Sequence, residues 1–113
     1  MLRIRISEEI DVIIQQIEEN GKTEYIRNRI ADLIIDSLNS VKDSFGYWEK
    51  LNLANAISNL KINWFRASLV NLEVALAPAY LRNENFTQRN KELDSYTYEK
   101  LMEAVQQCIR RIE

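Results

Sequence analysis

Residues 2–7 alternate strictly between apolar and polar side chains, and this alternation constrains the fold more than any other feature of the sequence. The segment reads Leu-Arg-Ile-Arg-Ile-Ser, and a period of two residues is typical of a β-strand with one buried face. A single strand leaves its backbone N–H and C=O groups unpaired. We therefore predict that the same strand of a second copy pairs with it in an antiparallel two-stranded ribbon, which makes the chain a homodimer or a higher even oligomer.

Two helices joined by a tight turn are predicted to follow this strand. Ser7 precedes several acidic residues, so its hydroxyl is suited to cap a first helix. Asn20 and Gly21 should end that helix, because glycine readily adopts the left-handed conformation found after a helix. Thr23 is suited to cap the second helix. The core stripes expected from the spacing are Ile10, Ile13, Ile14 and Ile17 in the first helix, and Ile26, Ile30, Leu33, Ile34 and Leu38 in the second.

Helices are also predicted for the rest of the chain, because it contains only 2 Gly and 1 Pro and so has few sharp turns. The polar stretch 39–46 indicates a junction between a module of residues 1–40 and a helical region of residues 41–113. Pro78 should end the fourth helix, the polar stretch 83–90 should connect it to the last helix, and Asp94 should cap that last helix. The expected apolar positions are Trp48, Leu51, Ala54, Ala56, Ile57 and Leu60 in the third helix, Ile62, Phe65, Leu69, Leu72 and Leu76 in the fourth, and Leu101, Ala104, Val105, Cys108, Ile109 and Ile112 in the last.

The order of strand, helix, Gly-containing turn and helix over Leu2 to about Leu38 resembles the ribbon-helix-helix (Arc/methionine-repressor-like) superfamily of DNA-binding repressors and antitoxins. This resemblance covers the N-terminal third of the chain. It implies a mainly α-helical fold in which the ribbon of a dimer enters the major groove of double-stranded DNA. By this resemblance, Arg3, Arg5 and Ser7 would read base edges. Lys22 and Thr23 would bind DNA phosphate at the N-terminus of the second helix.

These features predict a sequence-specific transcriptional regulator, most simply a repressor that binds an inverted repeat as a dimer. Two alternatives to a repressor stay open. The first is an antitoxin whose C-terminal helices bind a toxin. The second is a helical interaction or scaffold protein that binds no DNA. In the last case Arg3 and Arg5 are the solvated face of an edge strand, and Lys22 and Thr23 are a turn and its cap.

Catalysis is not expected, because the chain has no His, a single Cys, and no glycine-rich phosphate loop. We likewise expect no cofactor and no metal. A membrane span is not expected either, since the most apolar stretch, residues 67–81, is short and contains Glu73 and Pro78. The N-terminus is too charged for a secretory signal. We therefore expect a cytoplasmic protein, in which Cys108 is a buried thiol.

The C-terminal region also contains aromatic side chains and a near-heptad repeat of apolar residues. Trp48, Trp64, Phe65 and Tyr80 predict packing more than a ligand pocket or a partner groove, because aromatic residues at helical spacing usually pack. The near-heptad over residues 62–76 has three interpretations that the sequence leaves open. It extends the dimer interface, docks a partner helix, or packs within the chain.

Overall fold

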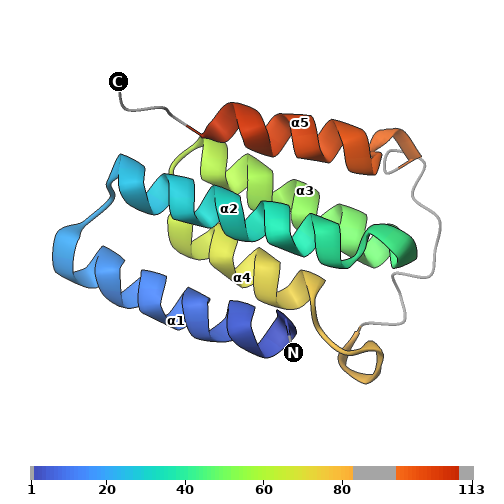
Figure 1. Cartoon of the computed structure of the whole chain (residues 1–113), viewed down its shortest axis with the longest axis horizontal. Helices are drawn as coiled ribbons and strands as arrows, with labels where there is room; N and C mark the ends of the chain where they lie inside the picture. The colour runs from blue at the N-terminus through green and yellow to red at the C-terminus, as the bar shows by residue number, and fades with distance from the viewer. Residues whose placement is uncertain (1, 83–93, 110–113) are drawn as a thin grey trace.

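The protein is a bundle of helices in the computed structural model, which describes residues 2–82 and 94–109 (Figure 1). Helices α1 (Leu2–Asn20) and α2 (Glu24–Ser40) form one hairpin, and α3 (Tyr47–Lys61) and α4 (Phe65–Ala75) form a second. Helix α5 (Tyr98–Cys108) packs on α2 and α3, on the side of the bundle away from α1. Short 3-10 helices, Lys42–Ser44 and Ala79–Leu81, follow α2 and α4.

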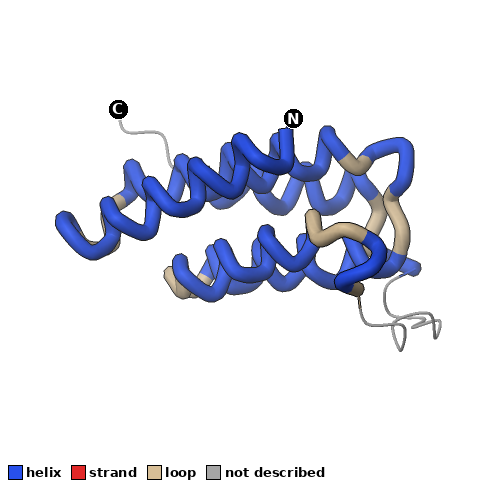
Figure 2. The backbone as a smooth tube through the Cα atoms, turned by 90° about the horizontal axis from the view of Figure 1, so that it is seen from below, coloured by secondary structure: helices blue, strands red, loops and turns tan. Residues whose placement is uncertain are grey.

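The predicted N-terminal strand is wrong, because residues 2–7 form the first turns of α1. Figure 2 shows only helices and loops among the described residues. The physical reason lies in Ile6, Ile10 and Ile13, which recur at intervals of four and three residues, the spacing of one helix face. Each of these side chains is at most 1% exposed. The mainly α-helical fold is confirmed, but residues 2–7 do not form the ribbon of a ribbon-helix-helix dimer.

The turn between α1 and α2 has the predicted form. Gly21 follows the last residue of α1 with φ of 74°, a conformation that glycine adopts without strain. Its N–H donates to the carbonyl oxygen of Ile17 at 2.8 Å. Thr23 is the N-cap of α2, and its hydroxyl accepts the N–H of Ile26 at 3.2 Å. Ser7, in contrast, lies inside α1 and is not its N-cap.

Replacing Ser7 with alanine tests whether Ser7 lies inside α1 or caps it, because the change in the free energy of unfolding has opposite signs in the two cases. Ser7→Ala should raise the free energy of unfolding by about 0.5 kcal/mol, because alanine is the better residue inside a helix. Thr23→Ala, at a true N-cap, should lower it by about 1 kcal/mol. Urea unfolding followed by circular dichroism measures both changes. A loss of about 1 kcal/mol for Ser7→Ala would show that Ser7 caps a shorter helix.

One hydrophobic core joins the helices, and α2 lies at its centre, where it contacts α1, α3, α4 and α5. Ile30, Ile34 and Leu38 of α2 are completely buried. The most extensive contact between two helices is that of α3 with α4. There the buried Ser68 hydroxyl donates to the carbonyl oxygen of Ala56 at 2.7 Å. The junction predicted after residue 40 falls at the end of α2, and helices from both sides of it contribute to this core.

Helix α4 is shorter than the predicted fourth helix. It begins at Phe65, so Ile62 lies outside it and is 54% exposed. It ends at Ala75, three residues before Pro78.

A helix that crosses a bilayer needs about 20 apolar residues, and no described helix has both the length and the hydropathy to span one.

Helix α5 begins later than its predicted cap. Thr97, not Asp94, is its N-cap, and the Thr97 hydroxyl accepts the N–H of Lys100 at 3.1 Å. Helices α2 and α5 thus begin in the same way, with a threonine N-cap whose hydroxyl accepts the N–H of the residue three positions later. Residues 83–90, predicted to be a connection, and the apolar position Ile112 lie outside the described residues.

Candidate functional site

The three residues predicted to read DNA bases do not share one face. Arg5 and Ser7 are exposed residues of α1, and helix residues two positions apart point in directions about 200° apart. The side chain of Arg3 lies outside the described residues. The prediction that these residues line the outer face of a strand is wrong, because the segment that carries them is a helix.

Lys22 and Thr23 lie at a small pocket beside the N-terminus of α2, with a volume of about 90 Å³. The Thr23 hydroxyl is already used as the helix cap. Arg27, which is 8% exposed, lines the same pocket and donates to Asn63 Oδ1. Glu24 lines it as well, so an approaching phosphate would meet a negative charge beside the positive ones. Phosphate binding by Lys22 and Thr23 stays a prediction.

Cys108 is a buried thiol, as predicted, and is 6% exposed at the end of α5. Burial raises the pKa of this thiol, and the positive charges of Lys61 and Arg27 offset only part of that increase. Among the described residues, no group of three or more His, Cys, Asp or Glu side chains is placed to hold a metal ion. The raised pKa favours the neutral thiol, which is the less reactive form.

The raised pKa of Cys108 predicts how stability depends on pH. Above the usual thiol pKa of about 8.5, the unfolded chain loses the thiol proton while the folded chain keeps it. The free energy of unfolding should therefore fall as the pH rises from about 8 to 10. Cys108→Ala should show a shallower fall over the same range, measured by urea unfolding at each pH. Equal slopes for the two proteins would contradict this prediction.

The four aromatic residues divide between the core and the surface. Phe65 is 2% exposed and belongs to the core. Trp48 is half-buried, and its Nε1–H donates to the carbonyl oxygen of Val74 at 2.7 Å. Trp64 and Tyr80 are 58% and 83% exposed. Packing therefore accounts for two of the four positions.

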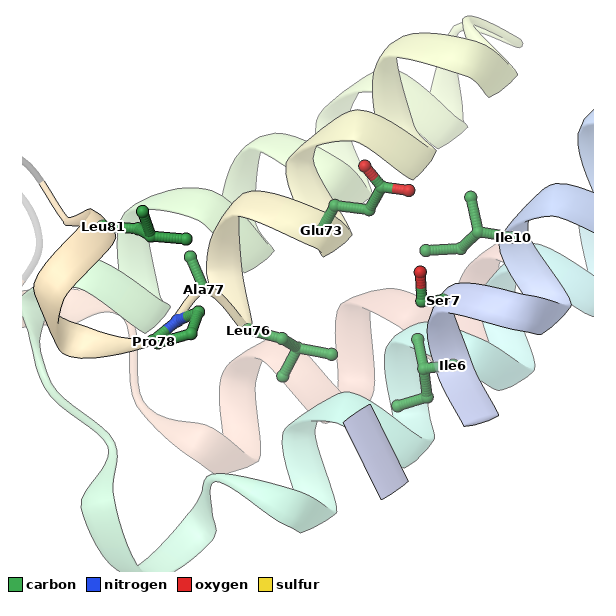
Figure 3. A pocket seen from close by; sticks show the side chains of 8 residues that line it. All are labelled: Ile6, Ser7, Ile10, Glu73, Leu76, Ala77, Pro78 and Leu81. Atoms are coloured by element: carbon green, nitrogen blue, oxygen red, sulfur yellow. The ribbon is translucent and has the colours of Figure 1, made fainter. Parts of the chain in front are cut away.

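An apolar pocket lies between the N-terminal half of α1 and the C-terminal end of α4, with a volume of about 240 Å³. Helix α1 contacts α4 much less extensively than α3 does, which leaves space between the two helices. Figure 3 shows the side chains from α1 facing those from α4 and the turn after it. The lining residues are Ile6, Ser7 and Ile10 from α1, and Glu73, Leu76, Ala77, Pro78 and Leu81 from the other wall.

Polar contacts fix the turn that forms the outer wall of this pocket. The N–H of Leu81 donates to the carbonyl oxygen of Pro78 at 2.9 Å. Arg82 Nη1 pairs with Glu49 Oε1 of α3 at 2.8 Å, and Arg82 Nε donates to the carbonyl oxygen of Ala77 at 3.0 Å. Glu49 is only 4% exposed. Leu81, 63% exposed, is therefore held at the edge of the pocket by a turn anchored to α3.

Glu73 gives the pocket a negative charge. Its side chain is exposed, and no hydrogen bond or ion pair joins it to another residue in the described part of the chain. No basic residue is among the described residues that line the pocket. Glu18 lies further along α1, on the side that carries Ser7. Unlike Glu73, it forms an ion pair, with Arg66 of α4 at 3.1 Å. The site is thus an apolar hollow with a carboxylate at its edge that makes no ion pair with a described residue.

Of the predicted site residues whose side chains the structure describes, only Ser7 lines this pocket. The sequence contained one signal for it: Glu73 is the single charged residue between positions 67 and 81. A lone carboxylate in an apolar stretch marks a position where an apolar surface meets water. The opposite wall comes from α1, far earlier in the chain, and apolar spacing alone does not predict that pairing.

No protein-family model, no curated protein and no solved structure matches this chain. The resemblance to the ribbon-helix-helix superfamily therefore has no support from a related protein.

Proposed function

We propose that this protein is a helical interaction module that binds a partner protein through the apolar pocket between α1 and α4. The observation that carries the proposal is a 240 Å³ hollow with apolar walls next to the exposed side chain of Leu81. A partner that covers both would remove apolar surface from water, which favours association. Binding energy in protein interfaces is concentrated at such pockets.

Val70 extends the apolar surface beyond the pocket. It is 56% exposed and lies three residues before Glu73, on the adjacent turn of α4. Residues three apart are neighbours on a helix surface, so Val70 and the pocket lie along one side of α4. Within the stretch 62–76, the near-heptad residues Phe65, Leu69, Leu72 and Leu76 pack within the chain instead, because they are at most 8% exposed, so a partner would meet Val70 and not the near-heptad.

The proposal develops the helical interaction protein that the sequence left open, and it differs from the predicted regulator. Base reading by residues 2–7 requires a ribbon, and these residues are helical. Residues 1–40 also contain five basic and eight acidic residues, whereas binding to DNA depends strongly on positive charge that neutralises phosphates. DNA binding by a repressor or an antitoxin stays a prediction, but the described features favour a protein partner.

Site-specific photo-crosslinking tests the proposal. Benzoylphenylalanine replaces Leu81 in one variant and Glu103, an exposed residue of α5, in a control variant. Each full-length chain is produced in the cells from which the sequence comes and irradiated there. We expect a discrete protein adduct from position 81 that position 103 does not give. The same adducts from both positions, or none from position 81, would contradict a binding site at the pocket.

A further inference from the structure

We infer that the segment bound at this pocket is an amphipathic helix that inserts an apolar side chain between α1 and α4 and places a lysine or arginine beside Glu73. The inference rests on the proposed function and specifies the chemistry of its partner. Three features of the site support it: the secondary structure around it, the shape of its apolar surface, and its charge.

The secondary structure around the pocket favours a helical partner. An extended peptide usually binds by adding a strand to an exposed sheet edge, and the described residues contain no strand. A helix instead binds by laying its apolar side chains into a groove between other helices. The wall of this groove is formed by α1 and α4 themselves.

The apolar surface has two parts, the pocket itself and the exposed side chain of Val70 on α4. The pocket, with Ile10 and Leu76 among its lining residues, accepts one side chain. Leu81, 63% exposed, lies at the edge of this pocket, and Val70, 56% exposed, lies one turn before Glu73 on α4. A partner helix that presents apolar residues at intervals of three or four matches such a row of contacts.

The charge around the pocket favours a basic partner. Glu73 has no ion pair within the described residues, and Asp11 of α1, four residues after Ser7, is likewise exposed and unpaired among them. Residues four apart on a helix share a face, so Asp11 lies on the side of α1 that carries Ser7. The nearby Arg82 is paired with the buried Glu49. A positive charge on the partner would therefore find carboxylates that form no ion pair with the described residues.

Selection from a displayed peptide library tests this inference with a defined probe. A library of random peptides of about 16 residues, enough for four helical turns, is selected on the wild-type protein. It is selected in parallel on Leu81→Glu and Glu73→Lys, whose folding is checked by circular dichroism. We expect the wild type to enrich helix-forming peptides with apolar residues three or four apart and an adjacent lysine or arginine. Glu73→Lys should enrich acidic residues at that place instead.

The affinity of one selected peptide then gives the size of the effect. Glu73→Gln should weaken binding about fivefold, the value of a charge pair at an interface rim. Glu103→Gln, the matched change on α5, should leave it unchanged. Leu81→Glu should weaken it by at least about tenfold, because it brings a carboxylate into an apolar contact.

The outcomes separate this inference from the proposed function. Peptides that depend on Leu81 but lack a basic preference, or that enrich proline and bind extended, would overturn the inference and leave the proposed function standing. The absence of any peptide sensitive to Leu81→Glu would contradict both. A wild-type dimer in sedimentation that Leu81→Glu converts to a monomer would show that a second copy occupies the pocket, and would overturn the inference.

Discussion

Replacing Ile34 with alanine is expected to lower the free energy of unfolding by about 2–5 kcal/mol. Ile34 is completely buried in α2, which contacts the four other helices, so the substitution leaves a cavity in a close-packed interior. Urea unfolding followed by circular dichroism and by the fluorescence of Trp48 and Trp64 measures the loss. Because both tryptophans lie after residue 40, the two signals should shift together if the core is shared.

The matched control for this variant is Ile62→Ala. Ile62 is 54% exposed and lies between α3 and α4, so its truncation should change the free energy of unfolding by at most about 0.5 kcal/mol. If residues 1–40 and 41–113 folded independently, the result for Ile34→Ala would differ. The unfolding transitions seen by circular dichroism and by tryptophan fluorescence would then separate, and the fluorescence transition would keep its wild-type midpoint.

Glu49→Ala is expected to cost about 2–4 kcal/mol of folding free energy. The Glu49 carboxylate is buried, pairs with Arg82 at 2.8 Å, and accepts the N–H of Gly46 at 3.1 Å at the start of α3. Breaking a buried pair typically costs about 3–5 kcal/mol. The expected value is somewhat lower here, because the Arg82 side chain is 29% exposed and can turn to water. Thermal or urea unfolding measures the change.

An exposed ion pair of the same protein provides the control. Glu18 and Arg66 pair at 3.1 Å, and both side chains are more than half exposed. Glu18→Ala should therefore change the free energy of unfolding by less than about 1 kcal/mol. Equal losses for Glu18→Ala and Glu49→Ala would mean that burial does not strengthen the contact with Arg82. The turn that carries Leu81 would then be anchored by other contacts.

Helical spacing of apolar residues predicted most of the bundle. The alternation of apolar and polar residues over 2–7 led to the wrong prediction of a strand at the start of the chain. The apolar spacing located α2, α3 and much of α4, and Gly21 and Thr23 located the turn after α1. Residues 2–7 fit a strand when taken alone, but Ile6 also begins the stripe that Ile10 and Ile13 continue. A pattern of six residues cannot separate these two assignments. The burial of Ile6 against the rest of the core decides between them.

The candidate site was much less predictable than the helices. Glu73 is visible in the sequence as a lone charge in an apolar stretch, but its significance depends on Ile10 and Ser7 lying opposite. That proximity results from how α1 packs against α2 and α4, and no local pattern encodes it. The base-reading residues were assigned from the expected strand. Residues two apart share a face in a strand but not in a helix, so these residues do not share a face in α1.

The extensive contact between α3 and α4 has a consequence for synthesis on the ribosome. These helices are separated by only three residues, 62–64, so the entropy lost on closing their loop is small and the pair can form quickly. The α1–α2 hairpin emerges first, however, and its isoleucine stripes are buried only against partners that include α3 and α4. During translation this hairpin must therefore keep apolar surface exposed until α4 and α5 have left the exit tunnel, and exposed apolar surface makes a nascent chain prone to aggregate.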